Sequence, residues 1–399
     1  MSDTSSGGVG VRILLFTGKG GVGKSTIAAG TATLAARAGH RTLVLSTDAA
    51  HSLADAFGIT AGSEPTEVEP NLFLQQVDAQ RLFERSWAEI QRYLLSVLDI
   101  AGVDPVAAEE LTVIPGAEEV LALLELRQHA RGGRYDVIVV DCAPTAETLR
   151  LLALPEALGW YMTRVFPVER RVVKALKPVL TRAAGVPMPG DSVFDAIERL
   201  HHELDEVRAL LSGPDASVRL VLTPETVVLA EARRSYTTLS LFGYRVDGVV
   251  ANRVFPAEGA DDWRAGWVLA QDAVLEQAHE SFAGLPLWRS SYRSSEPVGA
   301  DALAAMAEDV YAGADPVART EGEGPFRVTR GEHGATLHLA LPLVSRSDVD
   351  LARNGDELVV TVASYRRLLT LPAVLARLDV VGARVEQGEL RVRFEEKVS

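Results

Sequence analysis

The residues with the clearest chemical potential lie in the stretch GKGGVGKST, from Gly18 to Thr26. The spacing Gly18-x-x-x-x-Gly23-Lys24-Ser25 is typical of a loop between a strand and a helix whose backbone N–H groups surround a phosphate. In such a loop Lys24 pairs with the terminal phosphates, Ser25 binds Mg²⁺ and Thr26 reaches the α-phosphate. The alternative is a glycine-rich turn without a ligand. The residues that we expect around the nucleotide here are Lys19, Gly20, Gly21, Val22, Gly23, Lys24, Ser25 and Thr26.

Two aspartates follow strand-like runs and are candidates for catalysis and metal binding. Asp48 closes the apolar run RTLVLST, where its carboxylate would orient a water that attacks the γ-phosphate. Asp141 ends the run VIVV and is placed to hold Mg²⁺ through the metal's water shell. Because the carboxyl ends of parallel strands meet in one crevice, both side chains are expected near the phosphate loop. The alternative for Asp48 is an N-cap of the following helix, which is compatible with catalysis.

Lys19 is a second lysine that an ordinary phosphate loop does not need. The extended form KGGVGKS resembles the deviant phosphate-loop ATPases. That resemblance implies that Lys19 acts with Lys24 in catalysis by reaching the nucleotide of a partner subunit. ATP would then lie at the face of a homodimer. A solvated surface lysine is the alternative.

Two further stretches narrow the resemblance. LSTDAAHSLADAFG and VVDCAPTAETLRLLALP are similar to the two switch segments of the arsenical-pump and tail-anchored-protein-targeting ATPase family. Membership would imply ATP and Mg²⁺ as ligands and the hydrolysis of ATP to ADP and phosphate. Two tasks occur in that family, driving a metalloid pump and targeting hydrophobic proteins.

The same resemblance implies contacts on the adenosine side of the nucleotide. Glu225 in LTPETVVLAEARRSY and Asn252 in VDGVVANRVFP match the positions of nucleotide contacts, and Asn252 offers both a donor and an acceptor to an adenine edge. Pro286 and Leu287 fall in a segment that resembles the loop covering the base. Capping of a strand end by Asn252 and of a helix start by Glu225 are the alternatives.

The departures from the family pattern disfavour metalloid transport. Cys142 is the only cysteine, whereas a soft metalloid needs several thiolates. Ala146 and Glu147 replace the glycine and histidine of the pump form. A C-x-x-C pair is missing as well, so neither zinc nor an iron–sulfur cluster is expected. A metalloid-stimulated pump ATPase and an ATP-independent holdase remain the alternative functions.

Two inserts indicate a binding site for hydrophobic proteins. Residues 80–115 and 155–213 are helical by composition, and LFERSWAEIQRYLLSVL places its apolar residues largely on one broad face. In the relatives these positions form a client groove across the dimer, and capture of a hydrophobic segment fits this composition. Packing of the same faces on the ATPase core is the alternative.

The elements expected around these residues form a mostly parallel α/β sheet of the phosphate-loop NTPase type, with helices on both faces. Strand-like runs alternate with helical stretches through an ATPase domain at 1–311 that includes both inserts. Residues 312–325 are small, charged and broken by Pro and Gly, which predicts a linker. Residues 326–396 alternate apolar and polar side chains, which predicts an all-β sandwich. This last segment resembles an α-crystallin domain. The expected strands of the large sheet are VRILLFT, RTLVLSTD, LFLQQVDA, YDVIVVDCAP, SVRLVLTPE and VDGVVANRV.

Composition limits the partners. The net charge of −14 argues against nucleic acid or an anionic membrane as the main partner, so a membrane would be involved only indirectly. One cysteine and a start, MSDTSSGG, without a basic or apolar leader favour a cytoplasmic protein. The sequence therefore predicts a homodimeric Mg²⁺-ATPase that opens and closes a hydrophobic client groove.

Overall fold

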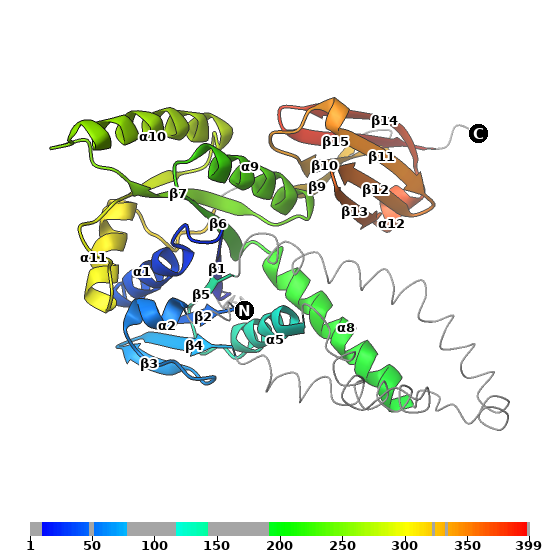
Figure 1. Ribbon diagram of the computed structural model, residues 1–399. Helices are drawn as coiled ribbons and strands as arrows, with labels where there is room; N and C mark the ends of the chain where they lie inside the picture. The colour runs from blue at the N-terminus through cyan, green and yellow to red at the C-terminus, as the bar shows by residue number, and fades with distance from the viewer. Residues whose placement is uncertain are drawn as a thin grey trace, which may run out of the picture. The chain divides into compact units, whose positions relative to one another are not determined.

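The computed structural model describes most of the chain (Figure 1). It forms two compact units: Met1–Gln76, His129–Ala146 and Leu211–Ser399 make up the first, and Val77–Gln128 with Glu147–Leu210 make up the second. The residues that the structure describes are 10–47, 52–77, 117–142, 191–320, 324–331 and 334–396.

The first unit is built on an eight-stranded sheet in the order β3-β4-β2-β5-β1-β6-β7-β8. All neighbouring strands are parallel except the β3–β4 pair. The six predicted strands are confirmed, whereas β3 and β8 were not predicted because they are short, partly exposed edge strands without a β-branched run. The strands are β1 (Arg12–Thr17), β2 (Thr42–Ser46), β3 (Thr66–Glu69), β4 (Leu72–Gln76), β5 (Val137–Asp141), β6 (Ala216–Leu222), β7 (Val246–Val254) and β8 (Leu287–Ser291).

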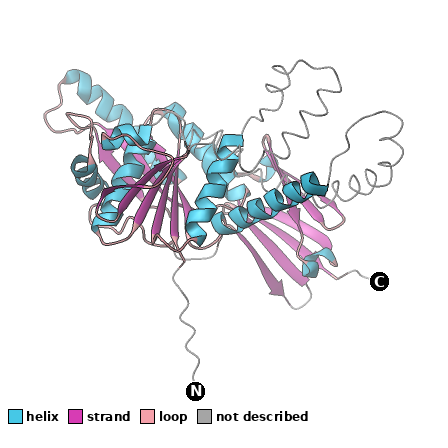
Figure 2. Ribbon diagram, turned by 90° about the horizontal axis from the view of Figure 1, so that it is seen from below, coloured by secondary structure: helices cyan, strands magenta, loops and turns pink. Residues whose placement is uncertain are grey.

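Helices cover both faces of this sheet, which confirms the predicted architecture (Figure 2). On one face α1 (Lys24–Arg37) packs against α2 (Ser52–Phe57) and α11 (Ala300–Tyr311). On the other face α9 (Thr226–Leu241) packs against α10 (Asp262–Ser281). The strands between them are buried on both sides, which explains their continuous apolar runs.

A buried charge network fixes the beginning of the segment that we expected to be a linker. Asp247 accepts hydrogen bonds from Arg12 at 3.1 Å and from Arg219 at 2.8 Å, and all three side chains are buried. The guanidinium groups also donate to backbone carbonyls of the connecting segment, Arg219 to Pro316 at 3.0 Å and Arg12 to Val317 at 3.1 Å. Pro316 and Val317 are therefore buried against the ATPase body, whereas residues 312–315 are exposed, and the linker at 312–325 stays a prediction.

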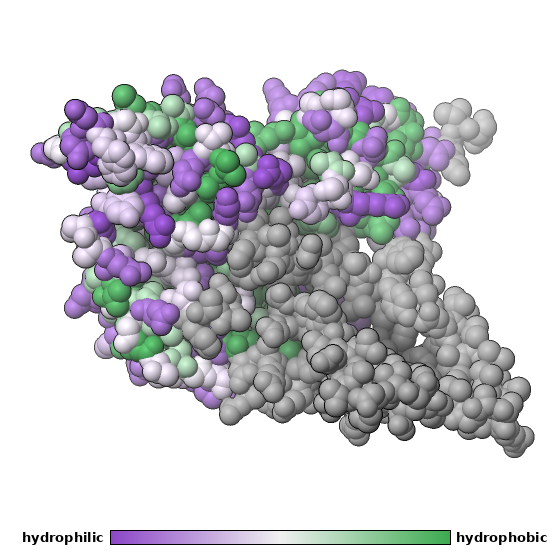
Figure 3. Space-filling model, viewed as in Figure 1, coloured by the Kyte–Doolittle hydropathy of each residue, from purple (hydrophilic) through white to green (hydrophobic). Residues whose placement is uncertain are grey.

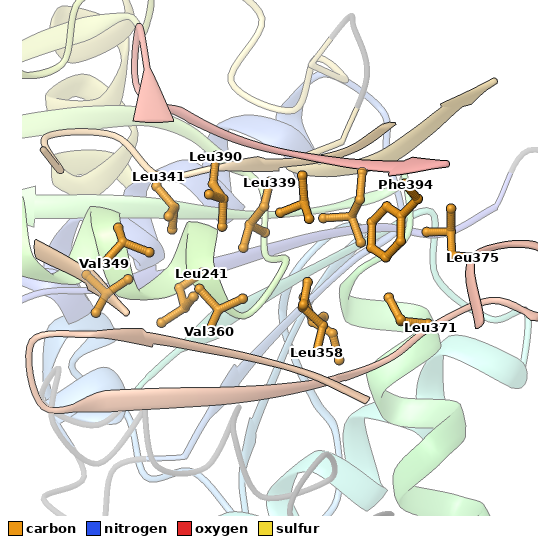
Figure 4. Packing of buried hydrophobic residues seen from close by; sticks show 14 of the residues in the cluster. Leu241, Leu339, Leu341, Val349, Leu358, Val360, Leu371, Leu375, Leu390 and Phe394 are labelled. Carbon is orange, nitrogen blue, oxygen red and sulfur yellow. The ribbon is translucent and has the colours of Figure 1, made fainter. Parts of the chain in front are cut away.

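The C-terminal segment is a sandwich of a four-stranded sheet, β14-β15-β10-β9, and a three-stranded sheet, β11-β12-β13. Leucine, valine and phenylalanine side chains fill the space between the sheets (Figure 4). The predicted all-β sandwich is thus confirmed. Its strands are β9 (Phe326–Gly331), β10 (Gly334–Ala340), β11 (Val349–Asn354), β12 (Glu357–Val362), β13 (Tyr365–Thr370), β14 (Asp379–Glu386) and β15 (Glu389–Glu395).

The sandwich is attached to α9 by apolar and polar contacts. Leu241, the last residue of α9, belongs to the sandwich core. The buried guanidinium of Arg367 donates to the carbonyl of Leu241, and Thr237 donates to the carbonyl of Pro342 at 2.7 Å. The carbonyl of Leu241, one of those that a helix end leaves without a partner inside the helix, thereby gains a cationic donor.

Most of α8 (Asp191–Leu211) belongs to the second unit, and this helix, in an insert that we expected to be helical, is amphipathic. Arg127, on α5 (Ala117–Arg131), forms an ion pair with Glu206 of α8. The insert at 80–115 and the remainder of 155–213 before residue 191 lie outside the described residues.

Hydrophilic and hydrophobic residues are intermixed on the visible face of the described chain (Figure 3). Within the described ranges no helix is long and apolar enough to cross a lipid bilayer.

Candidate nucleotide site

The predicted phosphate loop connects the end of β1 to the start of α1. Gly23 precedes the helix with φ 91°, a conformation that favours glycine. A Cβ atom on Gly18 would lie 2.1 Å from the carbonyl oxygen of Val221, so only glycine fits there. The loop therefore lies close against neighbouring strands, and the N-terminus of α1, which carries a positive dipole end, opens toward it.

Lys24 is buried in this loop. Its side chain is only 6% exposed, and its ammonium donates to the carbonyl of Lys19 at 3.4 Å. The lysine thus folds back over the turn, where the loop backbone and the helix start converge. Among the other predicted loop residues, Val22 is buried, whereas Lys19, Gly23, Ser25 and Thr26 are half-buried and Gly20 and Gly21 are exposed.

Asp141 lies at the carboxyl end of β5, beside the phosphate loop. It is fully buried and pairs in register with Phe16 on β1 and Ser46 on β2. Burial raises the pKa of the adjacent Cys142 thiol, the charge of Asp141 raises it further, and Lys24 acts in the opposite direction. Because the charges of Lys24 and Asp141 both affect the pKa of Cys142, the two side chains lie near the same thiol.

The predicted catalytic Asp48 lies outside the described residues. The chain that leads to it is described, since β2 ends at Ser46 and the N–H of Thr47 donates to the carbonyl of Asp141 at 3.0 Å. The role of Asp48 stays a prediction.

Asn252 connects the end of β7 to the phosphate loop. Its side chain is 8% exposed, and its amide N–H donates to the carbonyl of Val22 at 2.8 Å. Its amide oxygen accepts from the N–H of Arg253 at 2.9 Å. The amide oxygen thus bonds the backbone of its own strand, which continues to Val254, and the NH₂ group holds the loop; capping of a strand end stays an alternative. A contact with an adenine edge stays a prediction.

Glu225 occupies the position just before α9. It makes no side-chain hydrogen bond to the helix start, and the capping alternative is therefore not realised. Its exposed carboxylate instead accepts from the hydroxyl of Thr223 at 3.0 Å. A contact of Glu225 with the nucleotide stays a prediction.

The segment around Pro286 and Leu287 is not the loop that we expected. Leu287 begins strand β8 and pairs with Val249, while the carbonyl of Pro286 accepts from the N–H of Val249 at 2.9 Å. Both residues therefore lie at the amino end of the strand, away from Asn252. Neither lines the pocket beside the phosphate loop. A segment at a sheet edge was read as a loop because its apolar run is short.

A pocket of about 440 Å³ lies between the phosphate loop and the turn that follows β8. Gly23, Thr26 and Asn252 line one wall, and residues 290–297 line the other together with Met306. The volume falls within the range of small-molecule sites. The sequence analysis missed this second wall, although SSYRSSEP has the small polar residues and proline that are typical of a loop.

Comparison with known proteins finds two matching family profiles. The sequence profile of anion-transporting ATPases matches residues 11–312, and that of the HSP20-like domain found in ArsA matches residues 332–394.

Relatives of the chain match along nearly its whole length. A protein of Chlorobaculum tepidum named "Putative arsenical pump-driving ATPase" is 35% identical over 389 residues, which is 96% of both chains. One of Aquifex aeolicus with the same name and the number 1 is 32% identical over 393 residues, or 96% of this chain and 99% of its own. An uncharacterized protein of Streptomyces coelicolor is 39% identical over 394 residues, or 96% and 97%.

Proposed function

This chain belongs to the family of anion-transporting ATPases, and on that premise we propose that it is a homodimeric, Mg²⁺-dependent ATPase that targets or chaperones hydrophobic proteins. Family membership supports ATP hydrolysis. The dimer, the metal and the client are the finer parts of the proposal. The observation that carries it is the buried Lys24 in a glycine-shaped loop beside a pocket of nucleotide-binding size.

The described residues fit the hydrolysis of a nucleoside triphosphate. Lys24 and the N-terminus of α1 provide positive charge for the β- and γ-phosphates. Ser25 would hold Mg²⁺ directly and the buried Asp141 would hold it through water, and the donor set of hydroxyl and carboxylate oxygens suits this metal. Mg²⁺ would neutralise the charge that develops on the phosphates. Asp48 would orient the attacking water.

The homodimer is proposed from Lys19. Within the described ranges the ammonium of Lys19 forms no ion pair. The hydrogen bond from Lys24 goes to the backbone carbonyl of Lys19 and does not involve its side chain. Lys19 is half-buried at the mouth of the loop. There a phosphate of the nucleotide bound to a partner subunit would neutralise its positive charge. ATP, but not ADP, would present such a phosphate, so the nucleotide would control how closely the two copies approach.

The client groove is proposed from the two inserts, 80–115 and 155–213. Their apolar and aromatic composition supports capture of a hydrophobic segment, and α8 has the amphipathic pattern that a groove wall requires. The acidic chain would meet a membrane only through its client or a receptor.

The proposal is tested with a synthetic apolar peptide of about 20 residues, the length of a membrane span. We expect its affinity for the full-length chain to differ between a non-hydrolysable ATP analogue with Mg²⁺ and ADP. Equal affinity in both states would contradict a nucleotide-controlled groove and favour the ATP-independent holdase. Lys24→Ala, which removes the phosphate contact, serves as the control that should abolish any difference.

A metalloid-driven pump ATPase is the second candidate because relatives carry that name. Cys142 is the one thiol of the chain, it is buried, and burial raises its pKa, so it is poorly suited to bind a soft metalloid. Stimulation of ATP turnover by arsenite would favour this candidate over the targeting role.

A further inference from the structure

Strand β7 has an irregularity at the nucleotide pocket. Ala251 pairs with Arg289 and Val254 pairs with Ser291, so β7 has one more residue than β8 over this interval. Arg253 lies inside the interval with φ 59°, which is uncommon for a residue that has a Cβ atom. Bulges of this kind redirect side chains and occur beside functional sites.

The bulge supports both walls of the pocket. On one side Asn252 donates to the carbonyl of Val22 in the phosphate loop at 2.8 Å. On the other side the ring of Phe255 stacks on Tyr292, with ring centres 5.0 Å apart and planes 15° apart. The N–H of Tyr292 also donates to the carbonyl of Val254 at 2.7 Å. Residues 252–255 thus set the separation between the phosphate loop and the turn after β8.

Gln271 of α10 holds this bulge from behind. Its side chain is 5% exposed, and it makes two hydrogen bonds to the bulge backbone. Its amide NH₂ donates to the carbonyl of Arg253 at 3.1 Å, and its amide oxygen accepts from the N–H of Phe255 at 2.8 Å. A donor and an acceptor on one rigid amide match the two groups that the bulge leaves outside the β-ladder.

We propose that Gln271 is a positioning residue of the nucleotide site, which holds the bulge so that Asn252 and Tyr292 face a purine base from opposite walls of the pocket. The inference rests on the proposed binding of ATP in this pocket. Gln271 does not line the pocket itself and acts through the backbone at Phe255 and at Arg253, which is one of the lining residues. Its loss would therefore affect the base end of the nucleotide, whereas Lys24 and the loop would still bind the phosphates.

The test compares ATP with inorganic tripolyphosphate, which has no base, by calorimetric titration of the full-length chain. We expect Gln271→Met to weaken ATP binding about fivefold to tenfold, as for the loss of roughly one hydrogen bond, and to weaken tripolyphosphate binding by a clearly smaller factor. Gln277→Met is the matched control, since Gln277 is exposed on the same helix, and it should bind both ligands as the wild type does. If the methionine variant does not fold, Gln271→Glu takes its place. This variant keeps the acceptor but cannot donate, and it should also weaken ATP binding.

A second arm asks whether Gln271 acts through the bulge. In the variant Arg253→Gly, the glycine adopts the positive φ of the bulge without steric cost. The bulge then depends less on the two hydrogen bonds from Gln271. Gln271→Met should then cost less ATP affinity in the Arg253→Gly background than in the wild type.

Unchanged ATP affinity in Gln271→Met and Gln271→Glu, or an equal loss of ATP and tripolyphosphate affinity, would overturn the inference. Unchanged ATP affinity in Lys24→Ala and Asn252→Ala would instead overturn the placement of ATP in this pocket.

Discussion

The side-chain amide of Asn252 donates a hydrogen bond of 2.8 Å to the carbonyl of Val22, so the end of β7 holds the centre of the phosphate loop. The two residues are far apart in the sequence and come together because β7 and β1 lie on either side of β6 in the sheet. This contact makes the loop shape depend on a residue outside it.

Asn252→Ala should therefore loosen the loop. We expect about tenfold weaker ATP binding and a free energy of unfolding lower by about 1 kcal/mol, because one buried hydrogen bond is lost and the carbonyl of Val22 loses its donor. Isothermal titration and chemical denaturation measure the two effects. Asn354→Ala removes an exposed asparagine of the sandwich and is the control; a cost as small as this control's would contradict a structural role for the contact.

Gly23→Ala should be costly for two separate reasons. The φ of 91° strains any residue with a Cβ, by roughly 1 kcal/mol, and that Cβ would lie 2.3 Å from the amide nitrogen of Asn252. Gly39→Ala has a similar φ of 98° with no atom within 4 Å, so it isolates the strain. Thermal melting should show a larger loss for Gly23→Ala than for Gly39→Ala. Equal losses would show that the close approach to Asn252 does not matter.

The buried network predicts a strong effect of Asp247→Asn. Removing this charge leaves Arg12 and Arg219 buried without their carboxylate, which should lower the free energy of unfolding by about 3 kcal/mol. Asp309→Asn breaks an exposed ion pair with Arg293 and should cost below about 1 kcal/mol. Denaturant titration that ranks Asp309→Asn at or above Asp247→Asn would contradict this account.

Much of the ATPase fold was predictable because its strands are buried on both faces and have apolar, β-branched sequences. The strand β8 was not, since LWRSS at a sheet edge lacks this signal. That omission moved the expected base-covering loop to Pro286 and Leu287, whereas the pocket wall follows the strand at residues 290–297. An expected loop was thus the start of an edge strand, and a contact of Pro286 and Leu287 with the base stays a prediction.

The connection to the sandwich shows a different limit. The described residues 312–320 and 324–325 of the expected linker contain no helix or strand. Composition cannot show that the carbonyls of Pro316 and Val317 satisfy Arg219 and Arg12, because those arginines lie far away in the sequence. Every residue has a backbone carbonyl, so the residue types of a segment do not show which carbonyls accept hydrogen bonds from buried charges. The positions of Lys24 at the start of α1 and of Asp141 at the end of β5, by contrast, follow directly from the parallel sheet.

Stability of the sandwich should depend on pH through Glu389. Burial raises the pKa of this carboxyl, but hydrogen bonds from Arg391, Arg327 and His338 outweigh it and lower the pKa to about 2. Because the folded pKa lies below the unfolded value, the stabilisation is full above pH 4.5 and is lost as the pH falls toward 2. The stability difference between wild type and Glu389→Gln should thus shrink between pH 6 and pH 2 in thermal melts. A difference independent of pH would contradict the assignment.

The central claim is that ATP draws two copies of the chain together through Lys19. Sedimentation with Mg²⁺ and a non-hydrolysable ATP analogue measures this directly. We expect the wild type and the control Lys397→Ala to sediment as dimers with the analogue, and Lys19→Ala to sediment as a monomer. A wild-type chain that stays monomeric with saturating analogue, or a Lys19→Ala chain that dimerises like the wild type, would contradict the account.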